Sequence, residues 1–276
     1  GIVYDYISPT ANFYIFAAGL LLMLFSFYMM HDAKPLIVGK AAKVTTKEVL
    51  KHFNDSYEGK TIACSGYGNV AWGVCLKARE YGAKVVSISG RDGYIYDPEG
   101  IITDEKIDFL VKIRSSNDVK LKDYAEKFGC EFHPGEKPWG LKVDMAFPCA
   151  TQNEIGEEEA KQLIANGVKY IVEGANMPTT PEAVHYFLAN GGILAPAKAA
   201  NAGGVAVSAL EMSQNSMRYN WTAKEVDEKL HNIMIDIHNS SVAAAEKYGL
   251  GYDLIKGANI AGFEKVVAAM ISQGIY

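Results

Sequence analysis

The sequence has little cysteine and no run of basic residues. Its four cysteines form no C-x-x-C pair; they are Cys64, Cys75, Cys130 and Cys149. This pattern excludes a disulfide scaffold and offers no metal site, so we expect reduced, mostly buried thiols in a cytosolic protein. The formal net charge is −5, and no lysine or arginine run alternates with aromatic residues, which excludes a nucleic-acid partner.

Internal repeats, low-complexity tracts and a starting methionine are missing as well. Because the chain begins at Gly1, we expect a fragment or a processed product. Its 276 residues, 49% of them hydrophobic, are enough for one large α/β domain and a further segment.

Charge is absent from residues 6–30, and residues 11–30 are almost continuously apolar. A run of this length can span a bilayer core as a helix. Tyrosines toward its two ends and lysines from Lys34 onward match interfacial anchors, which would put the main domain in the cytoplasm. The alternatives are a buried core helix and unrelated sequence joined by a fusion or assembly error. A cleaved signal peptide fits less well, because no basic region precedes the run.

A glycine-rich turn, Gly66-Tyr-Gly68-Asn-Val-Ala71, follows a short apolar run and opens a helical segment. In a G-x-G-x-x-G/A turn, the first glycine permits the tight bend and the second lets the backbone approach a pyrophosphate. The phosphates then lie at the helix N-terminus, which favours negative charge. The alternative is an ordinary strand-to-helix turn, but the strand that follows at residues 84–89 completes a βαβ unit and favours the dinucleotide fingerprint.

The tip of that second strand reads Gly90-Arg91-Asp92. An NAD site usually has an acid there for the ribose 2′-hydroxyl, whereas an arginine accommodates the 2′-phosphate of NADP. Gly90 replaces the acid and Arg91 adds a cation, so we favour NADP(H), while Asp92 keeps NAD(H) open. The alternative for Arg91 is a solvated turn residue.

Apolar strands and helical segments alternate through the main domain. Predicted strands are residues 61–64, 84–89, 143–147, 170–173 and 193–195, and predicted helices are residues 44–53, 69–81, 104–115, 121–128, 156–166 and 181–189. Residues 93–100 are expected to form a turn region, and the chain from Gly203 onward is expected to be helical. The alternation predicts an α/β fold: a Rossmann-type, doubly wound, mostly parallel sheet with C-terminal helices over residues 44–276, preceded by a hydrophobic segment and linker at residues 1–43.

Three further segments place small or amide residues directly after a predicted strand: residues 148–153, 173–176 and 196–201. In such a fold the ligand binds outside the C-terminal ends of the strands. Amides donate and accept hydrogen bonds together, which suits a nicotinamide carboxamide and ribose hydroxyls. Each asparagine alone is more commonly a turn residue, so the repetition at one edge carries the prediction.

Five ordered segments together resemble the coenzyme-binding domain of hexameric bacterial glutamate dehydrogenases: CSGYGNVAWG at 64–73, GYIYDPEG at 93–100, PCATQNE at 148–154, EGANMPT at 173–179 and AKAANAGGVAVS at 197–208. The resemblance covers roughly residues 48–276. It implies that Gly66, Gly68, Asn69 and Val70 hold the pyrophosphate, that Thr151, Gln152, Asn176 and Asn201 contact ribose and nicotinamide, and that Val205 and Ser208 meet the substrate. Ser208 would lie at the distal carboxylate, which suits glutamate better than an apolar substrate.

The resemblance implies reversible oxidative deamination, in which glutamate, NAD(P)+ and water give 2-oxoglutarate, ammonium and NAD(P)H. The family's catalytic lysine and aspartate belong to a substrate domain that normally precedes this one, and they are not present in this chain, so its catalytic residues are unknown. Lys198, His133 and Asp144 are no credible substitutes. A homo-oligomer is expected for the full enzyme. The competing hypothesis is a membrane-tethered, catalytically inactive NADP(H)-binding module.

Overall fold

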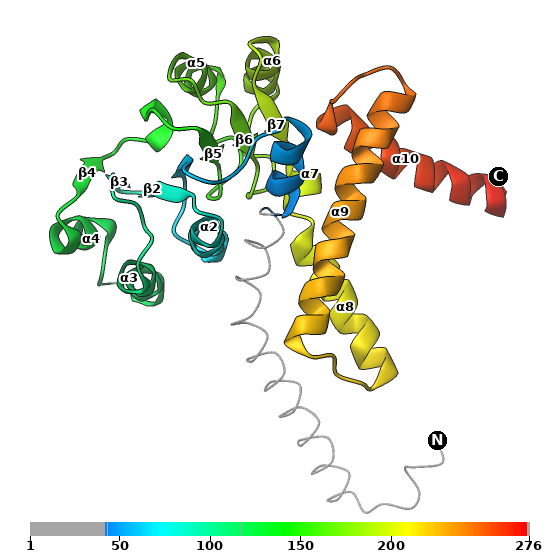
Figure 1. The fold of residues 1–276 in the computed structure, drawn as a ribbon, viewed down its shortest axis with the longest axis horizontal. Helices are drawn as coiled ribbons and strands as arrows, with labels where there is room; N and C mark the ends of the chain where they lie inside the picture. The colour runs from blue at the N-terminus through cyan, green and yellow to red at the C-terminus, as the bar shows by residue number, and fades with distance from the viewer. Residues whose placement is uncertain (1–41, 43, 117, 275–276) are drawn as a thin grey trace, which may run out of the picture.

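A seven-stranded sheet organises the chain (Figure 1). The computed structural model describes residues 42, 44–116 and 118–274. The strand order is β4-β3-β2-β1-β5-β6-β7. The strands are β1 (Thr61–Cys64), β2 (Lys84–Gly90), β3 (Gly93–Tyr96), β4 (Glu131–Pro134), β5 (Met145–Phe147), β6 (Tyr170–Val172) and β7 (Ile193–Ala195).

The central strands are parallel and reverse their order at β1. β1 pairs in parallel with β2 on one side and β5 on the other, and β6 and β7 continue the parallel part. The C-terminal ends of these strands, with the loops that follow them, are here called the carboxyl edge, and their N-terminal ends the amino edge. In such sheets the crevice at the reversal point of the carboxyl edge is the usual ligand position. The mostly parallel sheet predicted from the sequence is confirmed.

Two strands at one side of the sheet were not predicted. β3 and β4 are antiparallel to their neighbours, and β3 lies in the segment expected to be a turn region, so that prediction is wrong for residues 93–96. Arg91 and Asp92 alone connect β2 to β3, and such a two-residue connection forces an antiparallel hairpin. Gly93 is required in it, because its φ is +135° and a Cβ there would lie 2.1 Å from the His133 carbonyl oxygen.

Helices cover both faces of the sheet. Residues 44–52 are helical and pack on one face with α2 (Asn69–Glu80), α3 (Asp104–Ser115) and α4 (Leu121–Phe128), while α5 (Glu157–Ala165), α6 (Pro181–Ala189) and the 3-10 turn η1 (Pro138–Gly140) cover the other. In β1, Ile62 and Cys64 face the first group of helices and Ala63 faces the second. Both faces are therefore buried, as the nearly continuous apolar strands predict.

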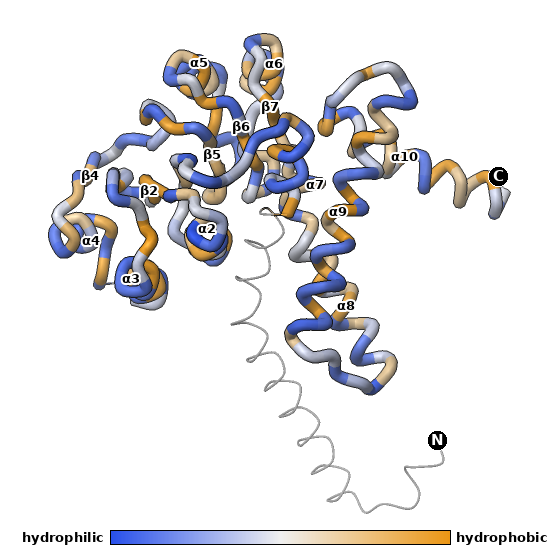
Figure 2. The backbone as a smooth tube through the Cα atoms, in the orientation of Figure 1, coloured by the Kyte–Doolittle hydropathy of each residue, from blue (hydrophilic) through white to orange (hydrophobic). Residues whose placement is uncertain are grey.

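The remaining helices lie beyond β7: α7 (Ala197–Ala200), α8 (Gly203–Met217), α9 (Ala223–Lys247) and α10 (Leu254–Gln273). Thr222 caps α9 by accepting a hydrogen bond from the Glu225 backbone N–H. α10 extends away from the sheet, and orange stretches mark its apolar residues in Figure 2. Among the described residues, no helix is long and apolar enough to cross a membrane; the candidate span at residues 11–30 lies outside them.

Candidate functional site

The glycine-rich turn joins β1 to α2 at the carboxyl edge. Gly66 is buried at φ +80°, and a Cβ on it would lie 3.1 Å from the carbonyl oxygen of Cys149. Gly68 differs, because a Cβ there would meet no heavy atom within 4 Å. In the described structure no side chain caps the N-terminus of α2, and its first turn contains no acid. The open amides and the dipole of α2 therefore form an anion-binding position that fits a pyrophosphate.

Asn69 and Val70 begin α2 beside this position. Asn69 Oδ1 accepts a hydrogen bond from Arg114 Nη1, at the end of α3. The same guanidinium lies 5.9 Å from the ring centroid of Trp72. Sequence reasoning missed Arg114, because nothing in the spacing of α3 indicates that its last turn reaches the glycine-rich turn. Arg114 adds a cation beside the α2 N-terminus.

Arg91 is exposed in the two-residue turn between β2 and β3. This is the carboxyl end of β2, where the sequence predicts the ribose 2′ position. Gly90 before it is packed closely: a Cβ there would lie 2.7 Å from the Tyr67 ring. An acid or any other side chain at position 90 would displace Tyr67, so the exposed charges at this turn are those of Arg91 and Asp92.

Backbone and side-chain hydrogen bonds link the carboxyl-edge loops to one another. The N–H groups of Gly174 and Ala175, after β6, donate to the carbonyl oxygen of Pro148, after β5, over 3.1 and 2.9 Å. Cys149 N–H donates to Ser65 Oγ, after β1, over 2.9 Å. Asn201 Nδ2 donates to Asn176 Oδ1 over 2.9 Å, which links the loops after β6 and β7. These loops thus form one connected surface.

A cavity of about 1060 Å³ opens on this surface. Its wall includes three predicted ligand-binding amides, Gln152, Asn176 and Asn201, and apolar side chains of α6 and β7. Thr151 is exposed next to Gln152. Among the described residues, the wall does not include Val205 or Ser208, which lie on α8. Val205 is 71% exposed, and Ser208 Oγ donates to the Gly204 carbonyl oxygen over 3.2 Å. The structure therefore brings the three amides together and leaves the two predicted substrate residues outside their cavity.

Two buried glutamates support the amide-bearing loops. Glu154 Oε1 accepts hydrogen bonds from the backbone N–H groups of Ala150 and Thr151, over 3.0 and 3.3 Å. Glu173 Oε2 accepts from the N–H of Ala197, at the start of α7, over 2.7 Å. Burial raises the pKa of both carboxyl groups, although these hydrogen bonds act in the opposite direction. The role of both acids was missed from the sequence; the position of Glu173 directly after an apolar strand is a signal that could have found it.

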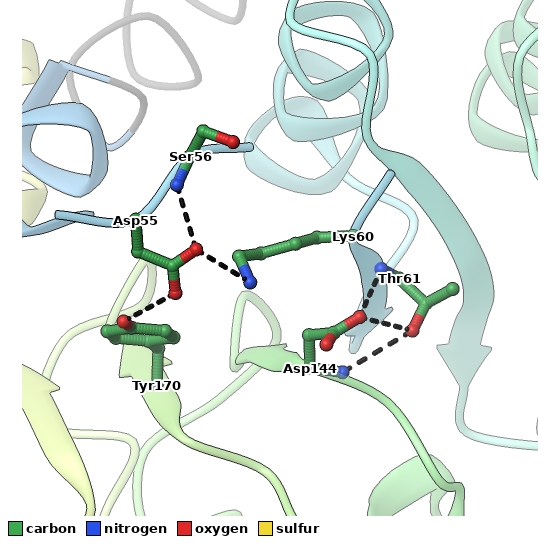
Figure 3. A network of polar contacts seen from close by, with 6 residues as sticks. All are labelled: Asp55, Ser56, Lys60, Thr61, Asp144 and Tyr170. Atoms are coloured by element: carbon green, nitrogen blue, oxygen red, sulfur yellow. Dashed lines mark hydrogen bonds and ion pairs between the residues drawn. The ribbon is translucent and has the colours of Figure 1, made fainter. Parts of the chain in front are cut away.

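The three residues that the sequence offered no catalytic role, Lys198, His133 and Asp144, make contacts of a structural kind. Lys198 is exposed at the cavity and donates to Asn259 Oδ1 on α10. His133 stacks on Tyr94 in the antiparallel strands, with 4.5 Å between ring centroids. Asp144 lies at the amino edge, where its Oδ2 accepts from the backbone N–H and hydroxyl of Thr61, over 2.8 and 3.0 Å (Figure 3). None of these contacts orients the side chain as an acid or base for the amide cavity.

The four cysteines are free thiols, and three of them are buried. Burial raises the pKa of Cys64 and Cys75, which keeps these thiols protonated. Within residues 42–274, apart from the undescribed positions 43 and 117, no group of three His, Cys, Asp or Glu side chains is arranged to hold a metal ion. The groups that the carboxyl edge offers to a ligand are backbone amides, side-chain amides and arginines.

Comparison with known proteins gives consistent matches. Residues 33–274 match the family model described as Glutamate/Leucine/Phenylalanine/Valine dehydrogenase. The chain is 56% identical to a NAD-specific glutamate dehydrogenase of Clostridium symbiosum over 88% of this chain and 54% of that protein, and 48% identical to a NADP-specific glutamate dehydrogenase of Haemophilus influenzae over the same shares. A solved glutamate dehydrogenase matches with TM-score 0.85 and 56% identity, over 88% and 54% of the two chains. The chain spans about half the length of these relatives.

Proposed function

The chain belongs to the Glutamate/Leucine/Phenylalanine/Valine dehydrogenase family, and we propose that it is the coenzyme-binding part of a glutamate dehydrogenase. The observation that carries this proposal is the carboxyl edge, where an uncapped helix N-terminus and three amide side chains lie on one set of linked loops. Such an edge suits the phosphates and the nicotinamide of one dinucleotide. The proposed reaction of the whole protein interconverts glutamate and 2-oxoglutarate with ammonium; the bound dinucleotide supplies or accepts the hydride.

The residues of this chain have binding and orienting roles in the proposal. Backbone N–H groups after Gly68 hold the pyrophosphate, with Gly66 giving the bend and Asn69 and Val70 beginning the helix. Thr151, Gln152, Asn176 and Asn201 orient the ribose and the nicotinamide ring. Val205 and Ser208 contact the substrate from α8, with Ser208 at its distal carboxylate. Ser208 already donates to a helix carbonyl, so it would turn toward the substrate when the substrate binds.

The groups that move protons at the substrate are proposed to come from the part of the protein that this chain does not contain. The relatives are about twice as long as the matched region. A lysine of lowered pKa and a carboxylate are needed to activate water and to transfer protons. Lys198 is not assigned this role, because its ammonium is held by Asn259 in α10.

For the choice of cofactor we propose NADP(H), on the basis of Arg91 at the tip of β2. The relatives divide on this point: the protein that is 56% identical is named NAD-specific and the one that is 48% identical NADP-specific. Asp92, next to Arg91, is the residue that would serve NAD(H). The ratio of NADPH to NADH affinity therefore tests the assignment directly.

We also propose the division into residues 1–43 and 44–276, with the main domain in the cytoplasm. Exposed apolar side chains on α8 and α10, among them Met212, Phe263 and Ile271, support contacts with further protein and hence an oligomer of the full enzyme. The second candidate function is a membrane-tethered module that binds NADP(H) without turnover, supported by the apolar residues 11–30. If the chain is monodisperse without detergent, the membrane-tethered alternative is contradicted.

The deciding experiment titrates NADH, NADPH and ADP-ribose into the purified chain by calorimetry. The proposal expects binding of all three, and an absence of binding by a folded chain would overturn it. A parallel assay of NADPH oxidation with 2-oxoglutarate and ammonium is expected to give no turnover. Turnover abolished by Ser208→Ala would mean that this chain supplies catalytic groups itself.

A further inference from the structure

Glu154 and Glu173 are two buried acids at the carboxyl edge. They are 9% and 6% exposed. Lys137 and Lys198 lower the pKa of Glu154 and Glu173 respectively, but burial outweighs them. Desolvation of a buried carboxylate is costly, and a neutral side chain of similar size would fill the same space more cheaply. Packing therefore does not explain why acids occupy these two positions.

Each glutamate holds one of the loops that carry amides. Glu154 accepts from two successive backbone N–H groups, those of Ala150 and Thr151, immediately before Gln152. This geometry fixes the direction of the peptide groups leading to Thr151 and Gln152. Hydrogen bonds from backbone N–H groups to a charged acceptor are stronger than those to a neutral one.

Glu173 acts on the next loop. Its carboxylate accepts from the N–H of Ala197, the first residue of α7, over 2.7 Å, although it lies 24 residues earlier in the sequence, after β6. α7 ends at Ala200, so Asn201 follows directly, and Asn201 Nδ2 donates back to Asn176 on the loop of Glu173. The two bonds, Glu173 to Ala197 and Asn201 to Asn176, close a ring that fixes where Asn201 lies.

We infer that Glu154 and Glu173 are positioning residues that preorganise the nicotinamide end of the cofactor site. They would act through the loops that carry Thr151, Gln152 and Asn201; Glu173 also lies in the wall of the cavity. This inference rests on the proposed function. It assigns the two acids to the nicotinamide half of the dinucleotide, because the backbone N–H groups that they hold belong to Ala150, Thr151 and Ala197; Glu154 is also hydrogen-bonded to Ser65, just before the glycine-rich turn.

The test compares two ligands that share all but the nicotinamide end: NADH and ADP-ribose. Affinities of the full chain for both are measured by calorimetry for the wild type, Glu173→Leu and Glu154→Leu. Leucine removes the acceptor and keeps an apolar volume. We expect each variant to lose about tenfold in NADH affinity, as for one charge-assisted hydrogen bond, while ADP-ribose affinity changes less than twofold.

Two further variants make the result specific. Glu173→Gln keeps an oxygen that can accept from Ala197, so it should retain most of the NADH preference that Glu173→Leu loses. Asp144→Leu is the matched control: it removes a carboxylate that accepts from a backbone N–H at the amino edge, and it should leave the ratio of the two affinities unchanged. If Glu173→Leu does not fold, Glu154→Leu carries the test.

The outcomes separate this inference from the proposed function. Equal losses of NADH and ADP-ribose affinity, or no loss of either, would overturn the positioning role and leave the coenzyme site intact. A wild-type chain that binds NADH no more tightly than ADP-ribose would overturn it as well. If the folded wild type binds neither ligand, the proposed function itself fails.

Discussion

The acids at the two edges of the parallel sheet have opposite surroundings. At the amino edge, Asp55 meets Lys60 at 3.0 Å and accepts from the Tyr170 hydroxyl over 2.8 Å, and Asp144 accepts from Thr61 (Figure 3). At the carboxyl edge, Glu154 and Glu173 accept from backbone N–H groups and have no ion pair among the described residues. Asp144 joins the start of β5 to β1, and Asp55 joins the loop before β1 to β6, whereas the carboxyl-edge acids hold loops.

The pKa shifts follow this difference. Burial tends to raise the pKa of Asp55, but hydrogen bonds from Tyr170 and Lys60 outweigh it and lower the pKa overall. For Glu154 and Glu173, burial dominates and the pKa is raised. Folding therefore favours the ionised form of Asp55 and the neutral form of Glu173, relative to the unfolded chain. Carboxyl groups whose pKa is raised by burial are typical of functional sites, which supports the proposed role of the carboxyl edge.

The largest effect is expected from a change that breaks the carboxyl edge alone. Gly68→Val places a side chain where a pyrophosphate would approach, and a Cβ there meets no protein atom within 4 Å, so the fold should be kept. We expect affinity for NADH and for ADP-ribose to fall at least about 100-fold, or ~2.7 kcal/mol, by calorimetry.

Gly262→Val, on α10, is the matched control, because a Cβ there is equally free of contacts. It should leave both affinities unchanged. Full binding by a folded Gly68→Val protein would contradict the assignment of the glycine-rich turn to the pyrophosphate.

A second effect is expected from a substitution at the amino edge, where it lowers stability. Asp144→Leu leaves the partly buried backbone N–H of Thr61 without its acceptor, which should lower the free energy of unfolding by about 1 kcal/mol. Urea denaturation measures the loss, and NADH affinity of the folded protein should not change. A loss of cofactor affinity without a loss of stability would show that the two edges are not separate in function.

A further effect is expected from a substitution of Arg91, which tests the assignment of the 2′-phosphate position at the carboxyl edge. Arg91→Asp replaces an exposed cation at the tip of β2 by an anion, so NADPH affinity should fall about tenfold more than NADH affinity. Arg79→Asp, a charge reversal near the other end of α2, is the control and should leave the ratio unchanged. Equal losses of NADPH and NADH in Arg91→Asp would remove Arg91 from the 2′-phosphate position.

The smallest effect is a difference in pH dependence. Because the pKa of folded Glu173 is raised, its contribution to stability is fully present below the unfolded value of about 4.3 and is lost as the pH rises through the folded value. Asp55 has a lowered pKa, so its contribution is present above about 3.9 and is lost as the pH falls through the folded value.

Urea denaturation over a pH series compares Glu173→Gln and Asp55→Asn with the wild type. Glu173→Gln should remove the loss of stability on raising the pH, and Asp55→Asn the loss on lowering it. If the Glu173→Gln curve runs parallel to that of the wild type as the pH rises above about 4.3, the raised pKa does not contribute to stability.

Much of the fold followed from local sequence. The predicted helices at 104–115, 121–128 and 181–189 agree with the structure in both bounds, and so do the strands at 61–64 and 193–195. These segments have strong periodicity and clear end signals, such as Thr103 and Thr180 at N-caps and Gly129 at a left-handed C-cap. β3 was missed because its four residues lie among glycines and a proline, and only pairing with β2 and β4 makes it a strand.

The sequence by itself determined the family resemblance, the glycine-rich turn and the positions of the amide residues after the strands, because these depend on short segments with fixed spacing. Only the tertiary structure decided which of them meet. It joined Asn201 to Asn176, brought Arg114 to Asn69, and separated Ser208 from the amide cavity. It also turned Glu154 and Glu173 inward and paired Asp144 with a distant strand. The reason is physical: burial and hydrogen-bond partners depend on packing between strands far apart in sequence, which no local pattern specifies.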